Sequence, residues 1–177
     1  MQNIKIKALL LAAGFGKRLR PLTLNKPKCL MEINNRPILG YWLDKLEEIN
    51  VEKILINTHY LSEQVNHFLE KDYKNNRKIK TSFEKVLLGT AGTLIKNYKF
   101  FSNSTGLIIH ADNFTHMGLI DFLNSHYKRP KNCLITMLTF NTNTPESCGI
   151  VELDSKGIVK DFHEKVSNPP GNKANGA

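Results

Sequence analysis

The stretch Leu11-Ala12-Ala13-Gly14-Phe15-Gly16-Lys17-Arg18-Leu19-Arg20-Pro21-Leu22-Thr23 directly follows an apolar, strand-like run and places glycines and positive charges in one short loop. Gly14 and Gly16 permit backbone angles that other residues rarely adopt, so main-chain N–H groups of the loop can approach phosphate oxygens closely. Arg18 and, further along the chain, Lys28 supply countercharge. The stretch therefore predicts a phosphate-binding loop at the end of a β-strand.

Two other kinds of phosphate loop fit this stretch poorly. The dinucleotide fingerprint requires a third glycine where the chain has Leu19. The Walker loop requires Gly-Lys followed by Ser or Thr after a longer spacer, and the sequence has no such segment. A nicotinamide-dependent dehydrogenase, which would rest only on the strand-glycine-helix pattern, is therefore disfavoured.

The combination of glycines with Arg, Pro and Lys resembles the signature of the sugar-1-phosphate nucleotidylyltransferases, Leu-x-x-Gly-x-Gly-x-Arg-Leu-x-Pro-Leu-Thr followed by Pro-Lys-x-Leu. The residues that match it are Leu11, Gly14, Gly16, Arg18, Leu19, Pro21, Leu22, Thr23, Pro27, Lys28 and Leu30. The resemblance continues through Leu88-Gly89-Thr90-Ala91-Gly92, Asp112-Asn113, Gly149 and Glu164-Lys165, and so covers essentially the whole chain. Within the family, the Gly-Thr-Ala-Gly segment is most similar to mannose-1-phosphate guanylyltransferases, which make GDP-mannose, and to enzymes that make a GDP-heptose.

The resemblance implies a Mg²⁺-dependent enzyme that transfers a nucleoside monophosphate unit from a nucleoside triphosphate to a sugar 1-phosphate and releases pyrophosphate. GTP with mannose 1-phosphate or a heptose 1-phosphate is the favoured pair, while UTP, dTTP and CTP remain open, as does choline phosphate as acceptor. A non-catalytic nucleotide-binding or regulatory subunit on the same fold is the competing hypothesis. The joint presence of Arg18, Lys28, Asp112 and Lys165 favours the enzyme.

Nucleotidyl transfer brings together negatively charged partners, so catalysis depends mainly on positioning and charge neutralisation. We assign Arg18 to the triphosphate and the departing pyrophosphate, because its planar guanidinium suits bidentate phosphate contact. Lys28 follows the stiff residue Pro27 and is assigned to the α-phosphate. These two are the predicted catalytic residues, and the segment from Gly89 is the expected floor for the base. The predicted nucleotide-binding residues are Leu11, Ala13, Gly14, Gly16, Lys17, Arg18, Lys28, Gly89, Thr90 and Gly92.

Two further sets of residues complete the predicted site. Asp112 follows the apolar run Leu107–Ala111, at a strand end where a carboxylate can hold Mg²⁺ that bridges phosphates, although a helix N-cap or Asx turn is the simpler role for such an aspartate. The family usually has glycine before this aspartate, whereas this chain has Ala111. For the sugar phosphate, the resemblance implies Gly149, Glu164, Lys165 and Asn175.

The apolar periodicity predicts the fold class independently of the motifs. Strand-like runs alternate with stretches of helical spacing, which favours a parallel sheet covered by helices. With the resemblance, this gives an α/β fold: a Rossmann-like three-layer sandwich with a mainly parallel, mixed sheet of the nucleotide-diphospho-sugar transferase type. The expected strands are Ile4–Leu11, Lys53–Asn57, Ile79–Phe83, Leu107–Ala111 and Leu134–Phe140.

Local signals predict the remaining elements. One helix begins near Pro37 and buries Trp42, and a second begins near Ser62, a suitable N-cap residue. The segment Asp154–Gly157 is typical of a β-hairpin turn. The stretch Ser167–Ala177, rich in Pro, Gly, Asn and Lys, is expected to be loop or poorly ordered.

A chain of 177 residues can bury one substantial core, so we expect a single nucleotidyltransferase domain. Residues 1–115 are its predicted nucleotide-binding part, and residues 116–177 begin its sugar-phosphate-binding part. The family fold continues beyond this point with more sheet and a second metal-binding aspartate. We therefore expect a C-terminally truncated member that binds nucleotide but turns over poorly.

The composition excludes several other classes of protein. The net charge of +9 is scattered and lacks interleaved aromatic residues, which disfavours nucleic-acid binding and suits phosphorylated substrates. Three cysteines at unrelated spacings form neither a metal motif nor a disulfide framework. The apolar run Ala8–Ala13 is too short to span a bilayer, so we expect a cytoplasmic protein without membrane contact. A homo-oligomer remains possible.

Overall fold

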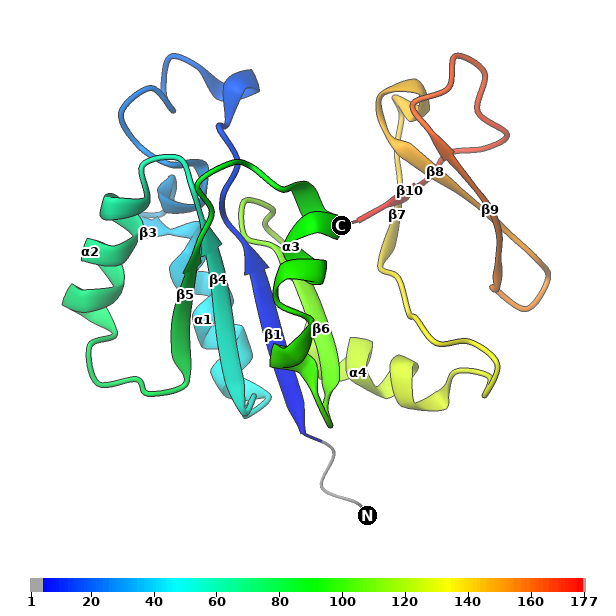
Figure 1. Cartoon of the computed structure of the whole chain (residues 1–177). Coiled ribbons are helices and arrows are strands. Elements are labelled where there is room, and N and C mark those ends of the chain that lie inside the picture. Colours follow the sequence, from blue (N-terminus) through cyan, green and yellow to red (C-terminus); the bar gives the residue numbers. More distant parts are fainter. Residues whose placement is uncertain (1–4, 177) are drawn as a thin grey trace. The chain divides into compact units, whose positions relative to one another are not determined.

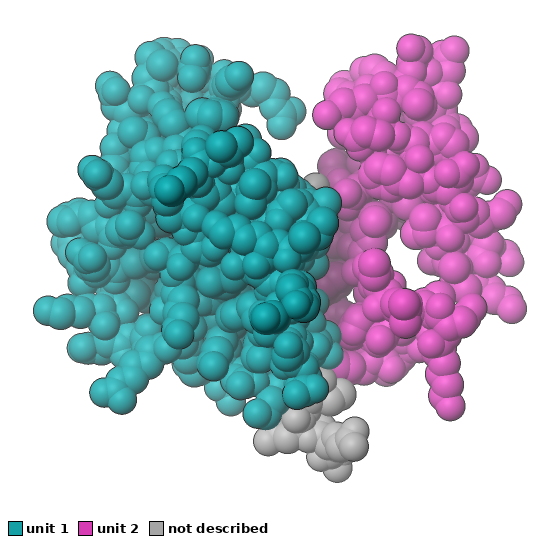
Figure 2. All heavy atoms as spheres, in the orientation of Figure 1, with its two compact units in different colours: residues 1–116 teal, residues 117–177 magenta. Residues whose placement is uncertain are grey.

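The computed structural model describes residues 5–176, which divide into two compact units, residues 5–116 and 117–176. Figure 2 colours the units separately. Each unit is built around a four-stranded sheet of its own. The assignment of the nucleotide to the first part of the chain and of the sugar phosphate to the second stays a prediction.

The first unit contains the predicted parallel sheet, with strand order β5-β4-β1-β6 (Figure 1). All three strand pairs in it are parallel. Leu9 and Leu10 in the central strand are fully buried, as are Ile54 and Ile56 in the neighbouring strand, because helices cover both faces of such a sheet. The strands are β1 Ile6–Leu11, β4 Lys53–Thr58, β5 Ile79–Phe83 and β6 Thr105–His110.

Helices α1 and α3 lie on opposite faces of this sheet (Figure 1). Helix α1 begins directly after Pro37 and buries Trp42, as predicted. Helix α2 begins at Ser62, but its N-cap residue is Leu61, with a φ of 49°, and no side chain caps it. The prediction that Ser62 is the N-cap is therefore wrong by one residue. The helices are α1 Ile38–Glu48, α2 Ser62–Asp72 and α3 Gly89–Lys96.

Short elements connect the larger ones in this unit. A two-stranded ribbon pairs β2 with β3 just before α1. Two 3₁₀ turns, η1 and η2, lie in the long loop after β1, and a third, η3, follows α3. Their bounds are β2 Glu32–Ile33, β3 Arg36–Pro37, η1 Lys17–Leu19, η2 Lys28–Leu30 and η3 Tyr98–Phe101.

The second unit joins one helix to an antiparallel sheet with strand order β7-β10-β8-β9. The predicted hairpin is confirmed: the Asp154 carboxylate Oδ1 accepts the N–H groups of Lys156 and Ile158 at 2.8 Å each, and Gly157 has a φ of 77°. The elements are α4 Leu119–Lys128, β7 Thr139–Asn141, η4 Pro145–Ser147, β8 Gly149–Leu153, β9 Val159–Glu164 and β10 Lys173–Asn175.

Two predictions fail in this unit. Within the predicted strand Leu134–Phe140, β-structure begins only at Thr139, and Leu134 and Ile135 are 81% and 80% exposed. An apolar run becomes a strand only where another strand pairs with it, and within residues 5–176 none pairs with residues 134–137. The Leu138 carbonyl accepts the Gly176 N–H at 2.8 Å. Conversely, the expected loop Ser167–Ala177 contains β10, whose Ala174 is fully buried between β7 and β8.

Among the described residues, no helix combines the length and the apolarity that crossing a membrane requires.

Candidate active site

The glycine loop after β1 is held in place by two contacts. The Ala12 N–H donates to Oδ1 of Asn57 at 2.7 Å, which fixes the point where the chain leaves the sheet. Gly16 has a φ of 61°, and its carbonyl accepts the hydroxyl of the fully buried Thr23 at 2.8 Å. A Cβ atom at Gly16 would lie 3.0 Å from Cγ2 of Thr23. Glycine is therefore required here by both the backbone angle and the available space.

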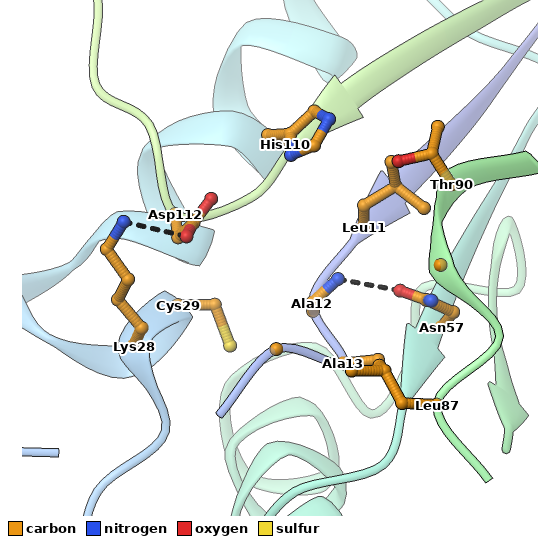
Figure 3. Close-up of a pocket in the computed structure, with 12 residues that line it drawn as sticks. Leu11, Ala12, Ala13, Lys28, Cys29, Asn57, Leu87, Thr90, His110 and Asp112 are labelled. Atoms are coloured by element: carbon orange, nitrogen blue, oxygen red, sulfur yellow. Dashed lines mark hydrogen bonds and ion pairs between the residues drawn. The ribbon is translucent and has the colours of Figure 1, made fainter. Parts of the chain in front are cut away.

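The loop forms one wall of a pocket of about 150 Å³ (Figure 3). The pocket lies at the carboxyl ends of β1, β4 and β6, beside the start of α3, where ligands of open α/β sheets bind. Its lining residues all belong to the first unit: Leu11, Ala12, Ala13, Gly14, Lys28, Cys29, Asn57, Leu87, Gly89, Thr90, His110 and Asp112.

Lys28 and Asp112 meet in this pocket. The Lys28 Nζ lies 2.7 Å from Oδ2 of Asp112, and the two side chains are 24% and 32% exposed. Lys28 opens the turn η2 directly after Pro27, and Asp112 follows β6 by two residues. The structure thus brings together an ammonium group and a carboxylate that both reach solvent. A phosphorylated ligand can bind the ammonium group, and a metal cation can bind the carboxylate.

The loop that carries Asp112 is anchored to α1. The indole Nε1 of Trp42 donates to the Asn113 carbonyl at 2.8 Å, and the Ala111 N–H donates to the Leu11 carbonyl at 3.0 Å. Trp42 was predicted only as a core residue, yet it also fixes the residue next to Asp112. This contact links the packing of α1 to the geometry of the pocket.

Sequence reasoning missed a buried polar group beneath the pocket. Glu84, 1% exposed, directly follows β5 and accepts hydrogen bonds from Asn57, Thr93 and the Leu88 N–H. Burial alone would raise the pKa of this carboxyl, but these hydrogen bonds, with a smaller contribution from the Lys96 ammonium, outweigh burial and lower its pKa below the ordinary 4.5. The sequence could have indicated Asn57, because it lies at the end of a predicted strand, and the ends of parallel strands meet at the edge of the sheet where Asp112 lies. The sequence offered no comparable signal for Glu84.

Four other lining residues were not predicted: Ala12, Cys29, Leu87 and His110. The Cys29 side chain is almost fully buried, and burial, with a smaller contribution from the Asp112 carboxylate, raises the pKa of its thiol to about 12. The thiol therefore stays protonated and acts as an apolar part of the wall. All three cysteines are free, in line with the prediction that their spacings form no disulfide framework.

Comparison with known proteins identifies the family. A sequence model of the nucleotidyl transferase family matches residues 7–177. The chain belongs to the nucleotidyl transferase family. The predicted resemblance is therefore confirmed.

Curated relatives of this nucleotidyl transferase include the mannose-1-phosphate guanylyltransferase catalytic subunit beta of Drosophila melanogaster, 32% identical over 96% of the chain and 46% of the relative. Mannose-1-phosphate guanylyltransferase 1 of Arabidopsis thaliana is 33% identical over 96% of the chain and 48% of the relative. The chain spans about half the length of these curated relatives.

Among solved structures, a putative glucose-1-phosphate thymidylyltransferase from Bacillus anthracis superimposes with a TM-score of 0.79 at 20% identity, over 96% of this chain and 68% of that one. At this identity the likeness concerns the fold. It confirms the predicted α/β fold class of the nucleotidyl transferase.

Some predicted nucleotide-binding residues of the nucleotidyl transferase do not line the pocket. Lys17 and Arg18 lie exposed in η1, where the Lys17 Nζ is 5.5 Å from the centre of the Phe15 ring. The Arg18 guanidinium has no hydrogen-bond or ion-pair partner within residues 5–176. Gly92 serves packing, because a Cβ atom there would lie 2.9 Å from Cβ of Leu88. The ligand roles of these residues stay predictions.

The four predicted sugar-phosphate residues of the nucleotidyl transferase gather at one end of the second unit's sheet. Gly149 in β8 is paired with Glu164 in β9, and the Lys165 Nζ lies 3.2 Å from Oε1 of Glu164. Ala174 in β10 is paired with Ile150, so the next residue, Asn175, lies beside Gly149. A Cβ atom at Gly149 would lie 2.5 Å from Cζ of Phe162 and 2.8 Å from Oε2 of Glu164, so any residue other than glycine would require both side chains to shift.

Proposed function

We propose that this nucleotidyl transferase moves a nucleoside monophosphate unit from GTP to a sugar 1-phosphate, with mannose 1-phosphate as the first choice, and releases pyrophosphate. The observation that carries the proposal is the pairing of Lys28 with Asp112 in the pocket beside the glycine loop. Transfer requires an attacking phosphate oxygen, the α-phosphorus and the leaving pyrophosphate in line, and each of these partners is negatively charged.

Lys28 holds the α-phosphate in this proposal. Its ammonium group stands on a stiff segment after Pro27, so its position changes little when a ligand enters. A phosphate oxygen then replaces the Asp112 carboxylate as its partner. Arg18, which has no partner of its own among the described residues, binds the β- and γ-phosphates and stabilises the departing pyrophosphate.

The residues of the pocket fit a magnesium ion that is shared with the substrate. Mg²⁺ is usually bound through one or two carboxylates together with phosphate oxygens and waters. Asp112 provides one partly exposed carboxylate, and residues 5–176 contain no group of three or more His, Cys, Asp or Glu side chains that would bind a metal by themselves. Asp112 would hold the ion, which neutralises charge on the triphosphate when bound.

The base binds between the glycine loop and the start of α3. Gly89 has no side chain and that of Thr90 is small, so the N–H groups of the first helical turn are accessible to the flat, polar edge of a purine. The cluster Gly149, Glu164, Lys165 and Asn175 binds the sugar phosphate, with Lys165 as its countercharge. GTP and mannose 1-phosphate are favoured because relatives of similar sequence are named mannose-1-phosphate guanylyltransferases.

A substrate panel tests the proposal. The protein is incubated with Mg²⁺, one of GTP, UTP, CTP or dTTP, and one of several sugar 1-phosphates, and products are identified by mass. We expect GDP-mannose or another GDP-sugar, formed with an equal amount of pyrophosphate. A nucleotide sugar with a different base would keep the reaction and change the substrate. Triphosphate binding without any product would favour the non-catalytic nucleotide-binding subunit.

A further inference from the structure

A buried carboxylate beneath the pocket connects segments that are distant in the sequence. Oε1 of Glu84 accepts the Thr93 hydroxyl at 2.6 Å and Nδ2 of Asn57 at 3.0 Å, and Oε2 accepts the Leu88 N–H at 3.2 Å. Oδ1 of the same Asn57 accepts the Ala12 N–H at 2.7 Å. Hydrogen bonds thus run from the glycine loop through β4 to both ends of the loop between β5 and α3.

These bonds fix the direction of every donor in the network. The Asn57 amide must point its oxygen at Ala12, so its NH₂ group faces Glu84 and the Thr93 oxygen, which lies 3.1 Å away. The Thr93 hydroxyl then has its proton toward Glu84. All three donors around the carboxylate therefore need an acceptor, which favours its ionised form.

The network supports one side of the pocket. Figure 3 shows Lys28 and Asp112 on one side, and Asn57, Leu87 and Thr90 on the other. The residues held by the network, Ala12 and Leu88, adjoin the lining residues Ala13 and Leu87. Lys28 and Asp112 are joined to each other instead and take no part in the network.

We propose that Glu84 is a positioning residue that sets the width of the slot between the glycine loop and the start of α3, and thereby the affinity for the nucleoside part of the triphosphate. This inference rests on the proposed function. Glu84 acts through Asn57 and Leu88, since it is 1% exposed and does not line the pocket. The triphosphate part depends on the other side of the pocket and should be largely independent of Glu84.

A buried carboxylate is costly to retain even with the Lys96 ammonium nearby, which argues that its acceptor pattern matters. Glutamine has nearly the same shape but only one acceptor oxygen. In Glu84→Gln, the new NH₂ group would therefore face either the Leu88 N–H or the two donors at Asn57 and Thr93. The backbone of Glu84 stays in place, because its N–H donates to the Thr58 carbonyl at 2.8 Å.

Binding measurements on the chain with Mg²⁺ test the inference. Affinity is measured for whichever of GTP, UTP, CTP and dTTP the wild type binds most tightly, and for inorganic tripolyphosphate, which carries no nucleoside. We expect Glu84→Gln to weaken triphosphate binding about tenfold and tripolyphosphate binding less than about twofold. The amide signals of Ala12 and Leu88 should move in the NMR spectrum. Glu70→Gln, on the exposed side of α2, is the matched control and should change neither affinity.

A second pair of variants keeps the test valid if Glu84→Gln does not fold. Thr93→Val preserves the shape of the side chain but removes the hydroxyl donor to Glu84, whereas Thr93→Ser preserves the donor. We expect Thr93→Val to weaken nucleotide binding and Thr93→Ser to restore it.

The outcomes separate the inference from the function on which it rests. If the wild type binds nucleotide and Glu84→Gln or Thr93→Val binds it equally well, the positioning role is wrong and the proposed function stands. Equal weakening of nucleotide and tripolyphosphate would also overturn the positioning role, because it would indicate a general loss of structure. If the wild type binds no triphosphate, the proposed function fails, and the inference fails with it.

Discussion

The Lys28–Asp112 pair shows how two residues that are 84 positions apart make one site. The motif around Lys28 and the place of Asp112 after a buried strand were both legible in the sequence. Their meeting depends on the parallel sheet, which brings the ends of β1 and β6 to the same edge. The ion pair itself is partly exposed and contributes little to stability, so its main value lies in the chemistry of the pocket.

Replacing Lys28 should therefore affect the reaction more than the fold. We expect Lys28→Met to lower the rate of nucleotidyl transfer about 100-fold or more, because a positioned cation on the transferring phosphate is lost. The free energy of unfolding should change by less than about 1 kcal/mol. Rates are compared by quantifying the nucleotide sugar, with Lys74→Met, at an exposed lysine outside the pocket, as the control. An unchanged rate in Lys28→Met would remove Lys28 from the catalytic machinery.

The Cys29 thiol provides a test of burial in the pocket wall. Its pKa, raised by burial to about 12, leaves almost no thiolate at pH 8, and alkylating reagents react with the thiolate. We expect iodoacetamide at pH 8 to label the half-buried Cys133 and Cys148 in the native protein, and Cys29 only after denaturation. Peptide mass spectrometry reads the labelling at each site. Labelling of native Cys29 at the rate of Cys148 would contradict the described pocket wall.

At the scale of elements, regular patterns were predictable and irregular ones were not. Strand β5, Ile79–Phe83, matches its predicted bounds, and each of its residues pairs with a residue of β4. The run that begins at Leu134 is more apolar and yet forms no strand before Thr139. The three-residue strand β10 shows the opposite case, since its position comes from pairing with β7 and β8 and not from its own composition.

Helix α1 contributes to the site through Trp42. We expect Trp42→Phe to lower the free energy of unfolding by about 1–3 kcal/mol, because the hydrogen bond to the Asn113 carbonyl is lost and a cavity is created. The loop that carries Asp112 should become more mobile, and nucleotide binding in the presence of Mg²⁺ should weaken. Urea unfolding measures the first effect, and titration calorimetry the second. If Trp42→Phe is destabilised but binds nucleotide as tightly as the wild type, the Trp42–Asn113 hydrogen bond contributes to stability and not to the site.

Strand β10 holds the second sheet together. Ala174 is fully buried between two strands, so Ala174→Asp would bury an unpaired carboxylate at a cost of several kcal/mol. We expect hydrogen exchange of residues 139–164 to accelerate strongly while β1, β4 and β6 keep their protection. The exposed neighbour Asn172 offers the control Asn172→Asp. If residues 139–164 exchange as slowly in Ala174→Asp as in the wild type, the central place of β10 in the second sheet is contradicted.

For the whole molecule, the sequence predicted the first unit better than the second. The first unit contains the parallel sheet, and both the apolar periodicity of its strands and the glycine loop after β1 predict this fold. Residues 117–177 rely on short antiparallel strands with many polar residues, where long-range pairing decides. The role of Glu84 was also not predictable from the sequence, because its hydrogen-bond partners Asn57, Leu88 and Thr93 come together only in the folded chain.

The central claim is that the pocket beside the glycine loop transfers the α-phosphorus of a nucleoside triphosphate to a sugar 1-phosphate. The most direct measurement supplies GTP labelled at the α-phosphorus, with mannose 1-phosphate and Mg²⁺, to an excess of protein, so that even a slow single turnover is detected. We predict that the label appears in GDP-mannose, that the pyrophosphate is unlabelled, and that Asp112→Asn abolishes both products. Label that remains in bound GTP, or that is released as GMP, would contradict the claim.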